Sequence, residues 1–393
     1  MSTYSFDQIV DRSHTSAAKT SAVLIQSEFN LNYYDDTISM WVADMDFACP
    51  PAILDAIKAR ADRQIIGYTM ESEAYQNSII NWYGRRHKMQ IEKDWLVFSN
   101  GTVSAIRNSL RSFTKEGQGV IIQPPVYYPF ERQIQDTGRT VVRNNLLRDE
   151  NNQYSIDFAD FEEKCKDPNT TMFIYCNPHN PTGNIWSAED TQKLLSICEA
   201  NDVIFFADEI HCDLIRSSQD FTSALNLSDY NKLIVATAVN KTFNVAGMHI
   251  TNLVIRSEEM RQTLTKYTGG FMISPFAMEA TIAAYDKSED WVTELNHVLD
   301  ENLSYMDTFI QEKLPKIKFN KPAGTYLTWL DFSAYGMDEQ DLLAKLADDA
   351  HLILEGGSMF GEPGKGFIRM NISSPKSVVV EALNRIEKAF NAL

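Results

Sequence analysis

Short continuous apolar runs alternate with amphipathic segments through the middle of the chain. The apolar runs lie at residues 119–123, 172–175, 203–207 and 233–236, and turn signals follow them. Runs of this kind are typical of strands that are buried on both faces of a sheet. Between them, segments such as 189–200 place their apolar residues on one side of a helix. This alternation predicts an α/β fold, with a mostly parallel sheet sandwiched by helices.

The pattern changes after about residue 286. A long amphipathic helix is predicted over 291–313, and strand-like segments follow at 325–330 and 366–370. The chain then ends in another amphipathic helix, whose apolar positions are Val379, Leu383, Ile386 and Phe390. This order of elements predicts a second, smaller α+β domain.

Three stretches of the chain are therefore expected. Residues 46–285 form the large domain, and residues 286–393 form the small C-terminal domain. Residues 1–45 form an N-terminal arm and part of the small domain. The first 40 or so residues are polar and irregular, and we expect this arm to pack on the small domain or on a second subunit.

The bulk composition narrows the range of partners. The 393 residues are 44% hydrophobic and 23% charged, which is ordinary for a globular protein. The formal net charge of −17 argues against nucleic acid and anionic membranes as partners. The chain has no run of about 18 apolar residues, so no membrane span is expected.

The cysteines and the N-terminal residues indicate in which cellular compartment the protein is expected. The five cysteines are odd in number and widely spaced, without a CxxC pair, so a disulfide framework is not expected. Residues 1–7 have neither a basic nor an apolar region, so no signal peptide is expected. The sequence therefore favours a reducing cytoplasm.

Three polar motifs follow predicted strands. Asn180 lies in Asn-Pro-Thr-Gly, Asp208 in Asp-Glu-Ile-His, and Lys241 in Asn-Lys-Thr-Phe-Asn. Because ligands of parallel sheets bind at the carboxyl ends of the strands, we expect the three side chains to converge. A buried lysine is costly unless it pairs, loses its proton or reacts, and pyridoxal phosphate (PLP) is the coenzyme that condenses with a lysine. The motifs together predict a PLP site.

Each reactive group of PLP has a candidate partner in these motifs. Lys241 would condense with the aldehyde, Asp208 would keep the pyridine nitrogen protonated, and Asn180 would donate to the phenolate oxygen. Taken singly, each residue has a plainer reading: a solvated lysine, a helix cap or satisfied ion pair at Asp208, and turn chemistry at Asn180. Their joint occurrence favours the coenzyme.

The phosphate and the ring of PLP have candidates as well. In the segment Gly101-Thr102-Val103, the glycine lets the backbone approach a phosphate, and the threonine offers an amide and a hydroxyl. A plain strand-to-helix turn explains the same segment when it is taken alone. Tyr127 follows another buried strand and is the candidate to stack on the ring, with Tyr128 as the alternative.

Arg369 lies in a predicted strand of the small domain. A buried guanidinium requires an anion, and the α-carboxylate of an amino-acid substrate fits it as a bidentate partner. A structural salt bridge would satisfy the same side chain, so both readings of Arg369 stay open.

In their order along the chain, these motifs resemble the fold-type I PLP-dependent enzymes of the class I/II aminotransferase superfamily, over roughly residues 35–390. Within it, the chain is similar to the branch of cystathionine β-lyases and cysteine-S-conjugate β-lyases. The similarity to this branch lies in the segment 42–47, in Tyr68 after a glycine, and in His211, where typical aminotransferases carry a tyrosine.

The resemblance also implies residue roles that the motifs alone do not give. Ala43 and Asp44 are expected to bind substrate, and His211 is expected to bind the coenzyme. Tyr68 is expected to reach the phosphate of the neighbouring subunit's coenzyme, which implies a homodimer with shared active sites. Many relatives have serine immediately before the lysine, whereas this chain has Asn240, whose amide can still donate to the phosphate.

The activity implied by the resemblance is that of a PLP-dependent carbon–sulfur β-lyase, with Lys241 as the catalytic base. Such an enzyme cleaves cystathionine or a related L-cysteine S-conjugate to a thiol, pyruvate and ammonia. An aminotransferase acting on an L-amino acid uses the same residues and is the first alternative. A non-catalytic PLP-binding regulator is the second, although the acidic chain has no room for a DNA-binding domain before residue 35.

Overall fold

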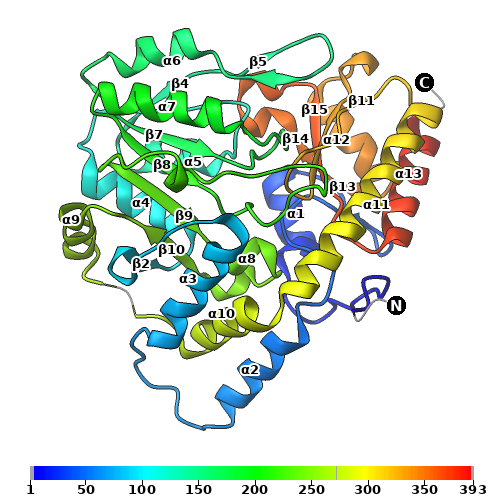
Figure 1. Ribbon diagram of the computed structural model, residues 1–393. Helices are drawn as coiled ribbons and strands as arrows, with labels where there is room; N and C mark the ends of the chain where they lie inside the picture. Colours follow the sequence, from blue (N-terminus) through cyan, green and yellow to red (C-terminus); the bar gives the residue numbers. More distant parts are fainter. Residues whose placement is uncertain (1–3, 271, 391–393) are drawn as a thin grey trace.

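The computed structural model describes residues 4–270 and 272–390 (Figure 1). Residues 1–3 of the N-terminal segment, in which no signal peptide is expected, lie outside this range. The described residues contain one large sheet, one smaller sheet and the helices that cover them. None of the described helices combines the length and apolar character that a membrane crossing requires. The five cysteines, all of them described, are free thiols.

Within the described residues, the large sheet has seven strands: β2 (Leu96–Ser99), β3 (Gly119–Ile122), β4 (Thr140–Arg143), β7 (Thr170–Cys176), β8 (Ile204–Asp208), β9 (Leu233–Thr237) and β10 (Thr251–Val254). Their order across the sheet is β2-β10-β9-β8-β7-β3-β4. The ladders from β9 to β4 are parallel, and β10 runs antiparallel to both of its neighbours. The mostly parallel sheet predicted from the apolar runs is therefore confirmed.

Burial on both faces explains why the strands are continuously apolar. In β8, Ile204 and Phe206 pack on one face, and Phe205 and Ala207 pack on the other. The first face is covered by α4 (Thr102–Phe113), α5 (Pro129–Asp136) and α9 (Glu258–Thr268). The second face packs against the core that includes α3 (Glu73–His87), α6 (Phe158–Cys165), α7 (Ala188–Ala200) and α10 (Pro275–Lys287). The helix α2 (Pro51–Ala61) lies against α10.

The smaller sheet is antiparallel and has the order β11-β12-β15-β14. Its strands are β11 (Lys318–Phe319), β12 (Leu327–Asp331), β14 (Glu355–Gly356) and β15 (Phe367–Asn371). The helices of this part are α11 (Glu289–Lys313), α12 (Glu339–Asp348) and α13 (Lys376–Phe390). In Figure 1, α11 (yellow) runs from beside α10 along the small sheet to α13 (red). The α+β character predicted for this region is thus present.

The N-terminal arm is less irregular than the sequence indicated. It contains α1 (Ala22–Phe29), where Ser21 accepts a hydrogen bond from the Leu24 amide as a helix cap. The strand β1 (Ile38–Ser39) then pairs in parallel with β13 (Leu352–Ile353). The expectation of an irregular arm is wrong for residues 22–29, which form α1. This helix is weakly amphipathic, and only its Ile25 and Phe29 side chains are buried. The expected packing against the C-terminal part of the chain is present through β1 and β13.

Candidate active site

A cavity of about 310 Å³ opens at the carboxyl ends of the parallel strands. Ligands of parallel sheets bind at this edge, because the helices and loops that follow the strands diverge there. Most of the predicted site residues line this cavity, namely Ala43, Gly101, Thr102, Val103, Tyr127, Asn180, Asp208, His211, Asn240 and Lys241. The convergence expected from the motifs is therefore observed.

Lys241 lies in the short helix α8 (Val239–Thr242), which begins directly after β9 and its connecting residue. The sequence placed it at the end of a strand, whereas the structure places it in the following helical turn. Its Nζ donates to the Ala43 carbonyl at 2.8 Å, and the Tyr326 hydroxyl donates to the same oxygen at 3.1 Å. Burial lowers the pKa of Lys241 to about 8, and the nearby positive charge of Arg369 acts in the same direction. The side chain is thus held in the cavity with a readily removed proton.

Asp208 ends β8 and is buried, with only 4% of its surface exposed. The Ile210 amide donates to its Oδ1 at 3.3 Å. Burial raises the pKa of Asp208 to about 7, because this amide and the charge of Lys241 compensate only part of the desolvation. A buried carboxyl group in this state gains most from a cationic partner in the cavity, and the protonated nitrogen of PLP is such a partner.

Asn180 and Arg369 form one unit beside the cavity. Arg369 donates from Nη1 to the Asn180 Oδ1 at 3.0 Å and from Nη2 to the Trp41 carbonyl at 2.9 Å. Because the amide oxygen of Asn180 accepts this bond, the orientation of the amide is fixed and its nitrogen is the donor toward other partners. Arg369 is also ion-paired with the buried Glu355, so the salt bridge left open by the sequence exists in the structure.

The start of α4 suits a phosphate. Gly101 is the N-cap residue with φ of +86°, a conformation that favours glycine, and no side chain caps the helix. The first amides of α4 are therefore available to an anion. The Thr102 and Thr251 hydroxyls share a hydrogen bond of 2.8 Å. Asn240 is partly engaged elsewhere, because its Nδ2 donates to the Ile250 carbonyl at 2.7 Å and leaves one amide hydrogen for a further acceptor.

Two rings complete the cavity wall. Burial raises the pKa of Tyr127 above its usual value, so its hydroxyl stays protonated. Burial also lowers the pKa of His211 to about 3, so the ring is neutral. The Nδ1 atom of His211 is buried without a hydrogen-bond partner among the described residues, so it is open to a partner in the cavity. The donor set, the open amides and this unpartnered nitrogen fit PLP.

Two predicted site residues lie elsewhere in the single chain. The Asp44 carboxylate pairs with Arg12 of the N-terminal arm at 2.7 Å and does not line the cavity, whereas the neighbouring Ala43 lines it. Tyr68 is 97% exposed on the loop between α2 and α3. Its predicted contact is with another subunit, so its position in one chain leaves that prediction untested.

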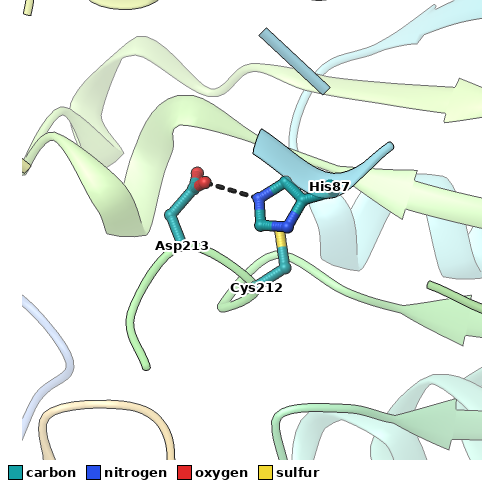
Figure 2. Close-up of side chains that lie close together, drawn as sticks. All are labelled: His87, Cys212 and Asp213. Carbon is teal, nitrogen blue, oxygen red and sulfur yellow. Dashed lines mark hydrogen bonds and ion pairs between the residues drawn. The ribbon is translucent and has the colours of Figure 1, made fainter. Parts of the chain in front are cut away.

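The sequence did not predict a buried hydrogen-bond network around Asp213, which reaches Thr242, the residue after Lys241. Figure 2 shows Asp213 and His87 joined by a hydrogen bond beside Cys212, a grouping whose ligand atoms lie within 4.8 Å of one another. The Asp213 oxygens are already engaged by Trp82 Nε1 at 3.2 Å, His87 Nε2 at 2.7 Å, Thr242 Oγ1 at 3.0 Å and Arg86 Nε at 3.4 Å. With a guanidinium among its partners, the carboxylate serves as an anchor for α3 and α8, not as a metal ligand.

Sequence reasoning also missed Glu355 and Tyr326. Glu355 directly follows the apolar run at residues 352–354, and an acid at the end of such a run is a signal of a paired, buried charge. Tyr326 was placed in a predicted strand without a role, because its contact with the Ala43 carbonyl joins residues that are far apart in the sequence.

Comparison with known proteins agrees with this geometry. The family model for aminotransferase class I and II matches residues 35–386. The cystathionine beta-lyase PatB of Bacillus subtilis is 37% identical over 91% of this chain and 93% of its own length. The PLP-containing cystalysin of Treponema denticola is 33% identical, with a TM-score of 0.95 over 99% of both chains. A PLP-bound C-S lyase of Staphylococcus hominis is 33% identical, with a TM-score of 0.93 over 98% of both chains.

These similarities extend over nearly the whole chain, including every strand of the large sheet and the segment that carries Arg369. They confirm the family resemblance inferred from the motifs around Asn180, Asp208 and Lys241. The fold class inferred from the apolar pattern is confirmed by the same neighbours. The chain belongs to the aminotransferase class I and II family.

Proposed function

We propose that this protein is a PLP-dependent carbon–sulfur β-lyase that cleaves cystathionine or a related L-cysteine S-conjugate to a thiol, pyruvate and ammonia. The observation that carries the proposal is the arrangement of Lys241, Asp208 and the Asn180–Arg369 unit around one cavity. Relatives that are 33% to 37% identical and bear the names cystathionine beta-lyase, cystalysin and C-S lyase support this reaction.

The cavity offers one residue for each part of the coenzyme. Lys241 would hold the aldehyde carbon, Asp208 the pyridine nitrogen and Asn180 the phenolate oxygen, while the amides at the start of α4 would hold the phosphate. When bound, PLP supplies a cationic ring that withdraws electrons from the α-carbon of the substrate. Tyr127 would face the ring from the wall of the cavity.

The proton transfers are assigned to Lys241. When Nζ is not bonded to the coenzyme, the lowered pKa of Lys241 gives a useful fraction of the neutral amine near pH 7 to 8, and a neutral amine is required to accept the α-proton. The Ala43 carbonyl, which accepts from Nζ at 2.8 Å, restricts the direction in which that atom points. Loss of the α-proton to Nζ would allow the β-carbon–sulfur bond to break, because the electron pair left on the α-carbon forms the α,β double bond as the thiolate leaves. Water would then convert the released unsaturated amino acid to pyruvate and ammonia.

Substrate orientation is assigned to Arg369. The bonds from its two terminal nitrogens to Asn180 and to the Trp41 carbonyl hold the guanidinium plane, and Phe360 lies with its ring centroid 4.9 Å from Cζ. A guanidinium fixed in this way binds a carboxylate in one orientation. The α-carbon of the substrate is thereby positioned relative to Lys241, which contributes to the rate through proximity.

We also propose a homodimer in which Tyr68 of each chain reaches the active site of the other. Support comes from the exposed apolar side chains of this loop, which are Ile65, Ile66, Tyr68 and Met70, and from Met272, which lies between α9 and α10 and lines a surface pocket together with Met70. Apolar side chains that lie together at a surface are typical of a protein interface. Sedimentation equilibrium tests this assembly, and a monomer at micromolar concentration would contradict it.

The reaction is tested by pyruvate release. Protein loaded with PLP is incubated with L-cystathionine, and pyruvate is measured alongside a Lys241→Ala variant as the control. We expect pyruvate from the wild-type protein and a loss of at least a hundredfold in the variant, because the base is removed. Keto-acid-dependent amino transfer without pyruvate would identify an aminotransferase instead. Coenzyme binding without turnover of either kind would favour a regulator.

A further inference from the structure

Glu355 is a buried acid for which the proposed reaction gives no role. It lies on β14 directly opposite Arg369 of β15 in the antiparallel ladder, and its side chain is 1% exposed. Residues that are directly opposite in such a ladder project to the same face of the sheet. The register of two short strands therefore produces an ion pair between a buried carboxylate and the proposed substrate-binding guanidinium.

The guanidinium of Arg369 is largely engaged before any substrate arrives. Nη1 donates to Asn180, and Nη2 donates to the Trp41 carbonyl and contacts the Glu355 carboxylate. The Nε atom is buried and has no hydrogen-bond partner among the described residues. An incoming α-carboxylate thus meets a cation with a donor still unsatisfied but with its charge already matched by Glu355.

Two carboxylates at one guanidinium cannot both stay charged without cost. Three groups act on Glu355 from the elements around it. The charges of Arg369 on β15 and Lys241 on α8 attract its carboxylate, and the hydroxyl of Tyr128 at the start of α5 donates a hydrogen bond to it. Burial raises the pKa of Glu355, and these three groups oppose the rise. A second carboxylate on Arg369 weakens the largest of the opposing interactions. Like charges that share a site in this way are relieved when one of them takes a proton.

We propose that Glu355 is a resident counter-ion that holds Arg369 in the free enzyme and takes up one proton from solvent when a substrate carboxylate binds there. In the free state the pair is neutral, with carboxylate and guanidinium. In the bound state a protonated Glu355, the guanidinium and the ligand carboxylate are again neutral together. Glu355 in this way lets the site accept a ligand that brings one negative charge without a change in the net charge of the site. The inference rests on the part of the proposed function that assigns Arg369 to the substrate carboxylate.

Proton uptake on binding is measured by titration calorimetry. PLP-loaded protein is titrated with propionate at pH 8 in two buffers of different ionisation enthalpy, which gives the number of protons taken up per ligand. Propionate has a carboxylate but neither an amino group nor a leaving group, so the measurement does not depend on lyase activity. We expect uptake approaching one proton in the wild-type protein, with affinity falling up to tenfold for each unit rise in pH.

Three variants make the assignment specific. Glu355→Gln should take up no proton and bind propionate with an affinity that does not change with pH, whereas Glu355→Asp should retain the uptake. Asp331→Asn is the matched control, because Asp331 is a buried acid of the same small sheet whose partners include Asn152 and not Arg369. This control should behave as the wild-type protein does.

The proposal is overturned if the wild-type protein takes up no proton, or if Glu355→Gln takes up as many as the wild type. The first of these outcomes needs no variant, so a Gln variant that fails to fold leaves the test intact. Absence of pyruvate release together with proton uptake that depends on Glu355 would reject the lyase reaction alone. Pyruvate release without proton uptake would reject the role of Glu355 alone.

Discussion

At the scale of single residues, the sequence revealed those polar side chains whose burial could be inferred from the residues next to them. Asn180, Asp208 and Lys241 each follow an apolar run, and a polar group there requires a partner whatever the rest of the fold does. Glu355 could not be assigned in this way, because its partner depends on the register between β14 and β15. Asp44 is a similar case, since its pairing with Arg12 brings together residues from the arm and the segment after β1.

Burial of the Lys241 amine should lower the free energy of unfolding of the coenzyme-free protein. We expect Lys241→Met to raise the free energy of unfolding at pH 7 by roughly 1–3 kcal/mol, because burial disfavours the ammonium ion. The pKa is about 8 in the folded protein and 10.5 in the reference state, so the unfolded chain binds the proton more tightly. The gain should therefore be complete below pH 8 and disappear as the pH rises toward 10.5.

Urea denaturation of the two coenzyme-free proteins across this pH range measures the difference. A Lys241→Met variant that is less stable than the wild type at pH 7 would show that the bond from Nζ to the Ala43 carbonyl outweighs the cost of burial.

At the scale of elements, the centres of helices and strands were predicted better than their ends. The helix predicted over 291–313 begins at Glu289, and the predicted strand at 325–330 is found at Leu327–Asp331. Ends depend on caps and tertiary contacts, which periodicity does not report. The helix α1 was missed because its apolar face is narrow and its cap is a single serine. The helix α8 was missed because four residues are too few for a periodic pattern.

The anchor at Asp213 should matter for stability because it joins α3, α8 and the turn after β8. We expect Asp213→Ala to lower the free energy of unfolding by about 3–5 kcal/mol, since it removes the buried hydrogen-bond partner of Trp82, His87 and Thr242 and one of the two carboxylate partners of Arg86. The control is Asp229→Ala, which removes a carboxylate that is 99% exposed and paired with Arg256. That change should alter stability by less than about 1 kcal/mol.

Urea unfolding of the PLP-free proteins compares the two variants. Equal and small losses in both would mean that the network in Figure 2 is not an anchor, despite the convergence of donors on its carboxylate.

At the scale of the whole molecule, the sequence predicted the layers but not their order. Alternating runs indicated a helix-covered parallel sheet, whereas the placement of β3 between β7 and β4 and of the antiparallel β10 beside β2 required the structure. Strand order depends on which surfaces are buried together, and each run is equally apolar. The division into residues 1–45, 46–285 and 286–393 remains a proposal, and so does the homodimer.

The central claim is that Lys241 is the residue that binds the coenzyme covalently. The direct measurement is borohydride reduction of PLP-loaded protein, followed by digestion and mass spectrometry of the peptides. The account predicts that the coenzyme is attached to the peptide that contains Lys241 and that the visible absorbance of the loaded protein is lost on reduction. Attachment to a different lysine, or no attachment at all, would contradict it.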